Sequence, residues 1–182
     1  GYYYGWGCTA PYASGETPRW ATYWKKLDPT MTATDGTPCQ SSSDPVKPTT
    51  TAGVNTIAGT QWDAARAYLH GPWRMPNQSE IAELFDTSKC KWTKGNLNGV
   101  DGYWIESLVS GYQGNKIFLP LDNFHYWSAT LGAPKENAYS FDNTNSRYQE
   151  ERYLGFPIRP VCARESSAIG TTLGYGPGKL IK

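Results

Sequence analysis

Few side chains in this chain have the type and spacing needed for acid–base or nucleophilic chemistry. The two histidines, His70 and His125, are far apart, and no Gly-x-Ser-x-Gly stretch presents a nucleophilic serine. Glu150 and Glu151 are adjacent, so in a strand their carboxyl groups would point to opposite faces instead of flanking one glycosidic bond. The sequence therefore predicts a protein that is not an enzyme.

The four cysteines do not have metal-site spacing. Cys8, Cys39, Cys90 and Cys162 form no Cys-x-x-Cys pair, which argues against a structural zinc site. Cys8 and Cys39 both lie in the loop-rich first quarter of the chain. A disulfide between them would restrain the long loop there, and this pairing is favoured. Cys90 and Cys162 are expected to be buried thiols or a second pair.

Calcium is the one cofactor left open. Asp122, Asp142, Asn143 and Asn145 carry oxygen atoms that calcium accepts as ligands. Calcium requires six to eight such oxygens, however, and an Asp-Asn-Thr-Asn stretch more often forms a turn. No cofactor is expected, with calcium as the alternative.

The composition sets the class of fold that must position these side chains. A length of 182 residues favours one domain, and 19 Gly with 13 Pro point to many turns. The pattern is typical of a loop-rich α+β or mostly-β domain rather than a helical bundle. With 17 basic and 16 acidic residues the net charge is +1, so no nucleic-acid partner is expected. No apolar run approaches the roughly 20 residues of a membrane span, so no membrane insertion is expected either.

Two helices followed by strands are expected. Apolar residues recur at helical spacing over 61–69, and Asn77 with Glu80 predicts a capping box for a helix over 78–86. Residues 27–60 are rich in Thr, Ser, Pro and Gly and are expected to form a long surface loop. Short β candidates occupy residues 89–93, 102–107, 116–119, 125–130, 137–142 and 156–162.

A polar and aromatic run precedes the last of these strands. From residue 147 it reads Arg-Tyr-Gln-Glu-Glu-Arg-Tyr-Leu, which is too polar for a core strand. Tyr and Arg combine a large contact area with hydrogen-bonding tips, and for that reason they are enriched in recognition surfaces. The run therefore indicates a binding face.

Five motifs occur in an order that resembles one family. They are WRMP at 73–76, the helix SEIAELF, NKIFLPL at 115–121, YWSAT at 126–130 and RYLGFPIRPV at 152–161. Together they resemble the C-type-lectin-fold domains of gut Bacteroidetes and Fibrobacter, which are related to the formylglycine-generating enzyme and to variable proteins of diversity-generating retroelements. The resemblance covers residues 1–163 and leaves 164–182 as a Gly-rich C-terminal tail. It implies an α+β, C-type-lectin-like fold with two helices packed on a small, twisted, mostly antiparallel sheet and long irregular loops.

The resemblance also implies roles for individual residues. The expected ligand-binding set is His125, Lys135, Asn137, Tyr148, Glu150, Glu151, Tyr153, Leu154 and Phe156. The expected structural set is Trp73, Arg74, Pro76, Trp127, Gly155, Arg159 and Pro160, with Arg159 paired inward to a carboxylate or to backbone carbonyls.

The implied function is non-catalytic ligand binding at a bacterial or phage surface. An adhesin or receptor-binding module would meet a protein or glycan receptor, in an extracellular or cell-surface location. One alternative is an assembly subunit of a fimbria or virion. Relatives begin with a strand for which there is no room before Gly1. Either that strand has been removed, or residues 171–175 or a partner protein replace it. The other alternative is a copper oxidase of the formylglycine-generating type that uses Cys90 and Cys162.

Recent retroelement diversification is not expected. Such mutagenesis acts on asparagine codons and readily yields Tyr, Asp, Ser, Leu or Phe, but it does not readily yield Gln, Glu or Lys. Lys135, Gln149, Glu150 and Glu151 therefore argue against a recently diversified copy.

Overall fold

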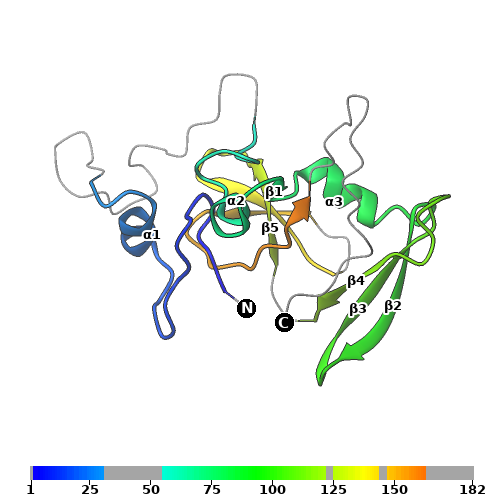
Figure 1. The fold of residues 1–182 in the computed structure, drawn as a ribbon. Coiled ribbons are helices and arrows are strands. Elements are labelled where there is room, and N and C mark those ends of the chain that lie inside the picture. Colours follow the sequence, from blue (N-terminus) through cyan, green and yellow to red (C-terminus); the bar gives the residue numbers. More distant parts are fainter. Residues whose placement is uncertain (1, 31–54, 122–124, 144–146, 163–182) are drawn as a thin grey trace.

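The computed structural model describes residues 2–30, 55–121, 125–143 and 147–162, which form an α+β arrangement with few helices and small antiparallel sheets (Figure 1). The helices are α1 (Trp20–Leu27), α2 (Ala64–Leu69) and α3 (Gln78–Leu84). The strands are β1 (Trp73–Arg74), β2 (Cys90–Leu97), β3 (Val100–Ser107), β4 (Lys116–Pro120), β5 (Tyr126–Leu131), β6 (Asn137–Phe141), β7 (Arg147–Glu151) and β8 (Val161–Cys162).

The described strands form three small sheets instead of the single sheet that was expected. Their orders are β2-β3-β4, β5-β6-β7 and β1-β8, and every described pairing is antiparallel. The edge of β5 that is not paired with β6 forms backbone hydrogen bonds with irregular segments. Trp127 N–H donates to the Pro157 carbonyl, and Ala129 N–H donates to the Pro76 carbonyl. Proline has no N–H to return a bond, so these contacts do not extend into strands.

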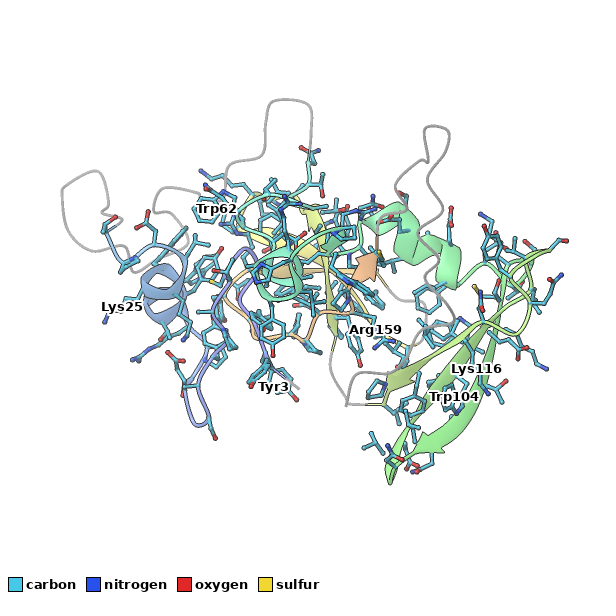
Figure 2. All side chains as sticks on the ribbon, in the orientation of Figure 1. Tyr3, Lys25, Trp62, Trp104, Lys116 and Arg159 are labelled. Carbon is cyan, nitrogen blue, oxygen red and sulfur yellow. The ribbon has the colours of Figure 1, made fainter. Side chains whose placement is uncertain are left out.

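The sheets lie at different places along the molecule. In Figure 1, α1 is at one end, β5 is near the centre, and the β2-β3-β4 sheet extends from the opposite end. Figure 2 shows the same separation, with Lys25 on α1 far from Trp104 and Lys116 on the β2-β3-β4 sheet. The central β5-β6-β7 sheet is therefore the part that brings distant segments of the chain together.

The C-terminal strand is shorter than expected. Residues 156–162 were predicted as one strand, but only Val161–Cys162 forms β8, and Phe156 makes an isolated antiparallel bridge to Tyr4. Pro157 and Pro160 remove two N–H donors from the interval, which prevents a continuous ladder.

The cap of α3 was predicted correctly, α2 begins three residues later than the expected residue 61, and a third helix was not expected. Asn77 and Glu80 form the predicted capping box of α3, while the Asp63 carboxylate caps α2, so that helix begins at Ala64. Helix α1 is this additional helix, and it buries Tyr23 and Trp24 on one face.

Tryptophans join the start of the chain to the central sheet. Trp6 and Trp127 are both fully buried. The indole N–H of Trp6 donates to the Ser128 carbonyl at 2.8 Å, and that of Trp127 donates to the Tyr4 carbonyl at 2.7 Å. Each large ring is therefore buried without leaving its polar atom unpaired.

The cysteines differ from the sequence expectation. Cys8 is a buried free thiol, which contradicts its expected disulfide with Cys39, a residue outside the described part of the chain. Cys90 is a partly buried free thiol, so it does not pair with Cys162. Cys162 is exposed, which contradicts the expectation that it is buried. Burial, together with the carboxylates of Asp86 and Glu83, raises the pKa of the Cys90 thiol.

We expect the protein to lose stability in alkaline solution. Burial raises the pKa of the Cys8 thiol from 9.0 to about 12 and raises the pKa values of the Tyr12 and Tyr23 phenols above their ordinary 10.0. These groups stay protonated in the folded chain at a pH where the unfolded chain ionises. Their contribution to stability is therefore complete below about pH 9 and is lost as the pH rises through the folded-state values.

Urea unfolding at about pH 8, 9.5 and 11 would measure this loss. Substitution Cys8→Ala removes one of the three groups, so its free energy of unfolding should fall less steeply with pH than that of the unmodified protein. A free energy of unfolding that stays constant between pH 8 and 11 would contradict the expectation.

Candidate functional site

A cluster of aromatic and acidic side chains lies on one face of the β5-β6-β7 sheet. The rings of His125 and Tyr148 stack with centroids 4.4 Å apart at an interplanar angle of 14°. The His125 Nδ1 atom lies 3.4 Å from the Glu150 carboxylate and 3.2 Å from the Ser140 hydroxyl. The Phe156 ring also packs on His125, with ring centroids 5.3 Å apart. We call His125, Tyr148, Glu150 and Phe156 the histidine cluster.

The sheet register explains why two members share a face. Strand β7 pairs with β6 so that Tyr148 is opposite Ser140 and Glu150 is opposite Ala138. Side chains two residues apart in a strand point to the same face, so Tyr148 and Glu150 project together. Glu151 is opposite Asn137 and belongs to the other face, as its adjacency to Glu150 predicts.

The two members from outside this strand pair come from distant parts of the sequence. His125 directly precedes β5, and Phe156 follows the turn after β7. Phe156 packs against the buried ring of Trp127 at 4.5 Å, which holds it in place. Tyr148 remains 38% exposed, so part of the stacked side chain is accessible to solvent.

The structure separates the other expected ligand-binding residues from this cluster. Tyr153 is half-buried and packs against Trp20 at 5.2 Å, and Leu154 packs on the buried core that contains Trp127. Tyr153 and Leu154 therefore belong to the packed scaffold and not to the exposed cluster. The side chain of Lys135 is exposed. Asn137 and Glu151 face away from Glu150.

Most of the expected structural residues have partners inside the fold. Arg74 donates to the Glu80 carboxylate at 2.7 Å, and Pro76 is buried. A Cβ at Gly155 would approach Tyr12, Pro18 and Tyr3 at 3.1 to 3.4 Å, so a side chain there would crowd these neighbours.

Three members of the structural set are placed differently from the rest. Trp73 is 39% exposed, which is more than expected for a scaffold residue. Arg159 and Pro160 are half-buried. The expected inward pairing of Arg159 is not observed, since Arg159 makes no hydrogen bond or ion pair with a residue that the structure describes. Burial lowers the pKa of this guanidinium.

Arg152 is a buried residue whose role sequence reasoning did not identify. Its side chain is fully buried, and Nε and Nη2 donate to the Tyr23 hydroxyl at 3.1 and 2.8 Å. Its guanidinium also lies 5.1 Å from the Trp6 ring centroid. The neighbouring sequence Arg-Tyr-Leu-Gly carried no signal that separated this arginine from the exposed residues before it.

The Ser140, His125 and Glu150 side chains do not have the geometry of a hydrolase triad. A triad requires the serine at one imidazole nitrogen and the carboxylate at the other. Here the hydroxyl and the carboxylate both contact Nδ1, and Ser140 is only 2% exposed. The arrangement instead orients the imidazole ring and fixes its stack with Tyr148.

The described residues contain neither a metal-binding cluster nor a helix that could span a membrane. No group of three or more His, Cys, Asp or Glu side chains in that part of the chain is arranged to hold a metal ion. Of the candidate calcium ligands, Asp122 and Asn145 lie outside the described residues. None of the helices described has the length and apolar character needed to cross a bilayer.

Comparison with family models, with curated proteins and with solved structures finds no match to this chain. The resemblance to C-type-lectin-fold domains therefore stays a prediction that rests on the sequence motifs.

Proposed function

We propose that this chain is a non-catalytic ligand-binding module with a C-type-lectin-like fold, an adhesin or receptor-binding domain on a bacterial or phage surface. The histidine cluster is its contact surface, and its ligand is a protein or glycan receptor. The observation that carries the proposal is the exposed Tyr148 ring, which is held flat against His125.

A preordered aromatic ring suits recognition for an energetic reason. Fixing a rotamer-rich side chain on binding costs roughly 0.5–1.5 kcal/mol. The stack with His125 and the sheet register already restrict Tyr148, so less of this cost arises when the ligand binds. Tyrosine also offers a hydroxyl at its tip for orientation.

Glu150 supplies the polar part of the surface. Its carboxylate contacts His125 yet keeps 28% of its side chain exposed, so it can accept hydrogen bonds from a ligand. Charged groups at the rim of a contact surface contribute mainly to orientation and specificity.

An assembly subunit is the second candidate, and one observation favours it. Strand β7 is last in the order β5-β6-β7, so one of its edges has no described strand beside it. An open edge can accept a strand from a partner subunit.

We expect the Tyr148→Ala substitution to weaken ligand binding by at least about tenfold, or ~1.4 kcal/mol, the loss typical of an interface anchor. A glycan array and purified surface proteins would identify the ligand, and biolayer interferometry would give the dissociation constant. Glu150→Gln keeps the side-chain shape but removes the charge. Its loss of binding affinity, expected to be smaller than that of Tyr148→Ala, would therefore report the contribution of the charge alone.

Tyr112→Ala is the matched control, because Tyr112 is also 38% exposed but lies between β3 and β4. Equal losses of binding affinity in Tyr148→Ala and Tyr112→Ala would contradict the proposal that the histidine cluster is the contact surface. A folded domain that binds nothing on the arrays but forms defined oligomers would favour the assembly subunit.

A further inference from the structure

A second surface, separate from the histidine cluster, is lined by tyrosine and proline. Two depressions share Tyr2 in their lining, with volumes of about 240 and about 810 Å³. The smaller is formed by the N-terminal segment, α2 and residues 157–160, and the larger by the N-terminal segment and the loop before α1. We call this surface the tyrosine groove, and its tyrosines are Tyr2, Tyr3, Tyr4, Tyr12 and Tyr68.

The aromatic rings of the groove are arranged around an exposed pair. Tyr2 is 61% exposed and Tyr68 is 66% exposed, and their rings meet edge to face with centroids 6.5 Å apart. The phenols of both also lie near that of Tyr4, whose pKa is raised by burial and by these two neighbours. Figure 2 shows Tyr3 at the margin of the molecule on the side of the N-terminal segment.

The floor of the groove is rigid. The Tyr12 hydroxyl donates to the Tyr153 carbonyl, and Tyr4 exchanges backbone hydrogen bonds with Phe156 at 3.0 and 3.1 Å. Gly155 adds no side chain, and a Cβ there would meet Tyr12 at 3.1 Å. The groove is therefore largely preformed and needs little ordering to accept a ligand.

The groove presents almost no net charge. None of the described residues that line the smaller depression has a charged side chain. The larger one contains Glu16, whose carboxylate lies 2.9 Å from the Lys26 ammonium and accepts the Ala13 N–H at 2.7 Å. Its negative charge is thus compensated within the chain, so the groove attracts neither a cationic nor an anionic ligand.

The hydroxyl groups of the groove add hydrogen-bond donors. Neither Tyr2 nor Tyr68 makes a side-chain hydrogen bond to a described residue, so both phenols can donate to an incoming carbonyl. A polyproline II segment has solvated carbonyls, no internal hydrogen bonds and about 3.1 Å of length per residue. Proline offers no N–H, so such a segment needs donors from its receptor and supplies apolar rings in return.

We propose that the tyrosine groove binds a neutral, proline-rich segment of a partner protein in the polyproline II conformation. Its pyrrolidine rings fill the two depressions beside Tyr2, and the Tyr2 and Tyr68 hydroxyls donate to its carbonyls. Aromatic-lined grooves suit such segments because a preformed polyproline II helix loses little entropy on binding. This binding is independent of the histidine cluster and of its proposed receptor.

A labelled decaproline peptide provides the direct test by fluorescence anisotropy. We expect saturable binding to the unmodified protein and no binding of a ten-residue Gly-Ser peptide. The Tyr68→Ala variant should bind decaproline at least about tenfold more weakly. Tyr68→Phe keeps the ring and should lose only a few-fold, because one neutral hydrogen bond is removed.

The Tyr112→Ala variant should bind decaproline like the unmodified protein, since Tyr112 is exposed but does not line the groove. Near-ultraviolet circular dichroism would establish that each variant is folded. The absence of saturable decaproline binding by the folded protein would overturn the proposal, as would equal affinities for Tyr68→Ala and the unmodified chain. Self-association in analytical ultracentrifugation that Tyr68→Ala abolishes would overturn it too, because a second copy would then be the occupant.

Discussion

Replacing Asp63 with alanine is expected to lower the free energy of unfolding by about 3–5 kcal/mol. The carboxylate is fully buried, and it accepts backbone N–H bonds from Gly59 at 2.7 Å, Ala65 at 2.9 Å, Arg66 at 3.1 Å and Met75 at 2.9 Å. The substitution would leave these donors without acceptors, and each buried, unsatisfied group costs about 1–3 kcal/mol. It would also remove the N-cap of α2.

Chemical denaturation followed by tryptophan fluorescence would measure this loss. Asp101→Ala is the matched control, since Asp101 is an exposed residue of β3 and should lose no more than about 0.5 kcal/mol. The loss in the free energy of unfolding for Asp63→Asn should lie between those of Asp63→Ala and Asp101→Ala. The asparagine keeps one acceptor oxygen but turns an amide nitrogen toward backbone donors. A loss below about 1 kcal/mol for Asp63→Ala would show that the hydrogen bonds to this carboxylate contribute little to the stability of the fold.

Replacing Arg152 with methionine is the second large effect, with an expected loss of about 3 kcal/mol. Methionine keeps the apolar volume but removes the donors to the Tyr23 hydroxyl and the donor to the Lys135 carbonyl at 3.3 Å. The Tyr23 hydroxyl donates to the Trp6 carbonyl at 2.8 Å, so the change would also weaken the link between α1 and the start of the chain.

A double-mutant cycle would separate this network from simple loss of packing. Arg152→Met and Tyr23→Phe remove opposite ends of the same hydrogen bonds, so the double variant should lose less than the sum of the single losses. Arg66→Met, at an exposed position of α2, is the control for the substitution itself. Strict additivity of the two losses would contradict a shared network.

Local signals predicted the elements whose ends are set by nearby side chains. The capping box of Asn77 and Glu80 and the end of α2 at Leu69 were both correct, because a cap depends on residues within one turn. Helix α1 was missed although Trp20, Tyr23, Trp24 and Leu27 have helical spacing, since a cluster of aromatics also suits a loop.

The same contrast holds for the candidate site. Tyr148 and Glu150 were both expected in the binding set, but β7 was not among the expected strands, so only the structure shows that the two side chains share one face. Tyr153 and Leu154 were expected in the same binding set, but the chain turns after Glu151, so that Tyr153 packs against the Trp20 ring and Leu154 packs on the buried core. A turn of this kind changes the faces of all later residues, and no local pattern signalled it.

The sequence by itself determined the mixed α+β class, the presence of α2 and α3, the capping box of α3 and the polar, tyrosine-rich character of the run from Arg147. These properties follow from composition and from contacts within a few residues. Only the tertiary structure decided that His125 stacks on Tyr148, that Arg152 is buried against Tyr23, and that tyrosines of the N-terminal segment and of α2 line one groove. Such pairings depend on which distant segments the buried tryptophans and the central sheet bring together, and that selection is made by packing over the whole chain.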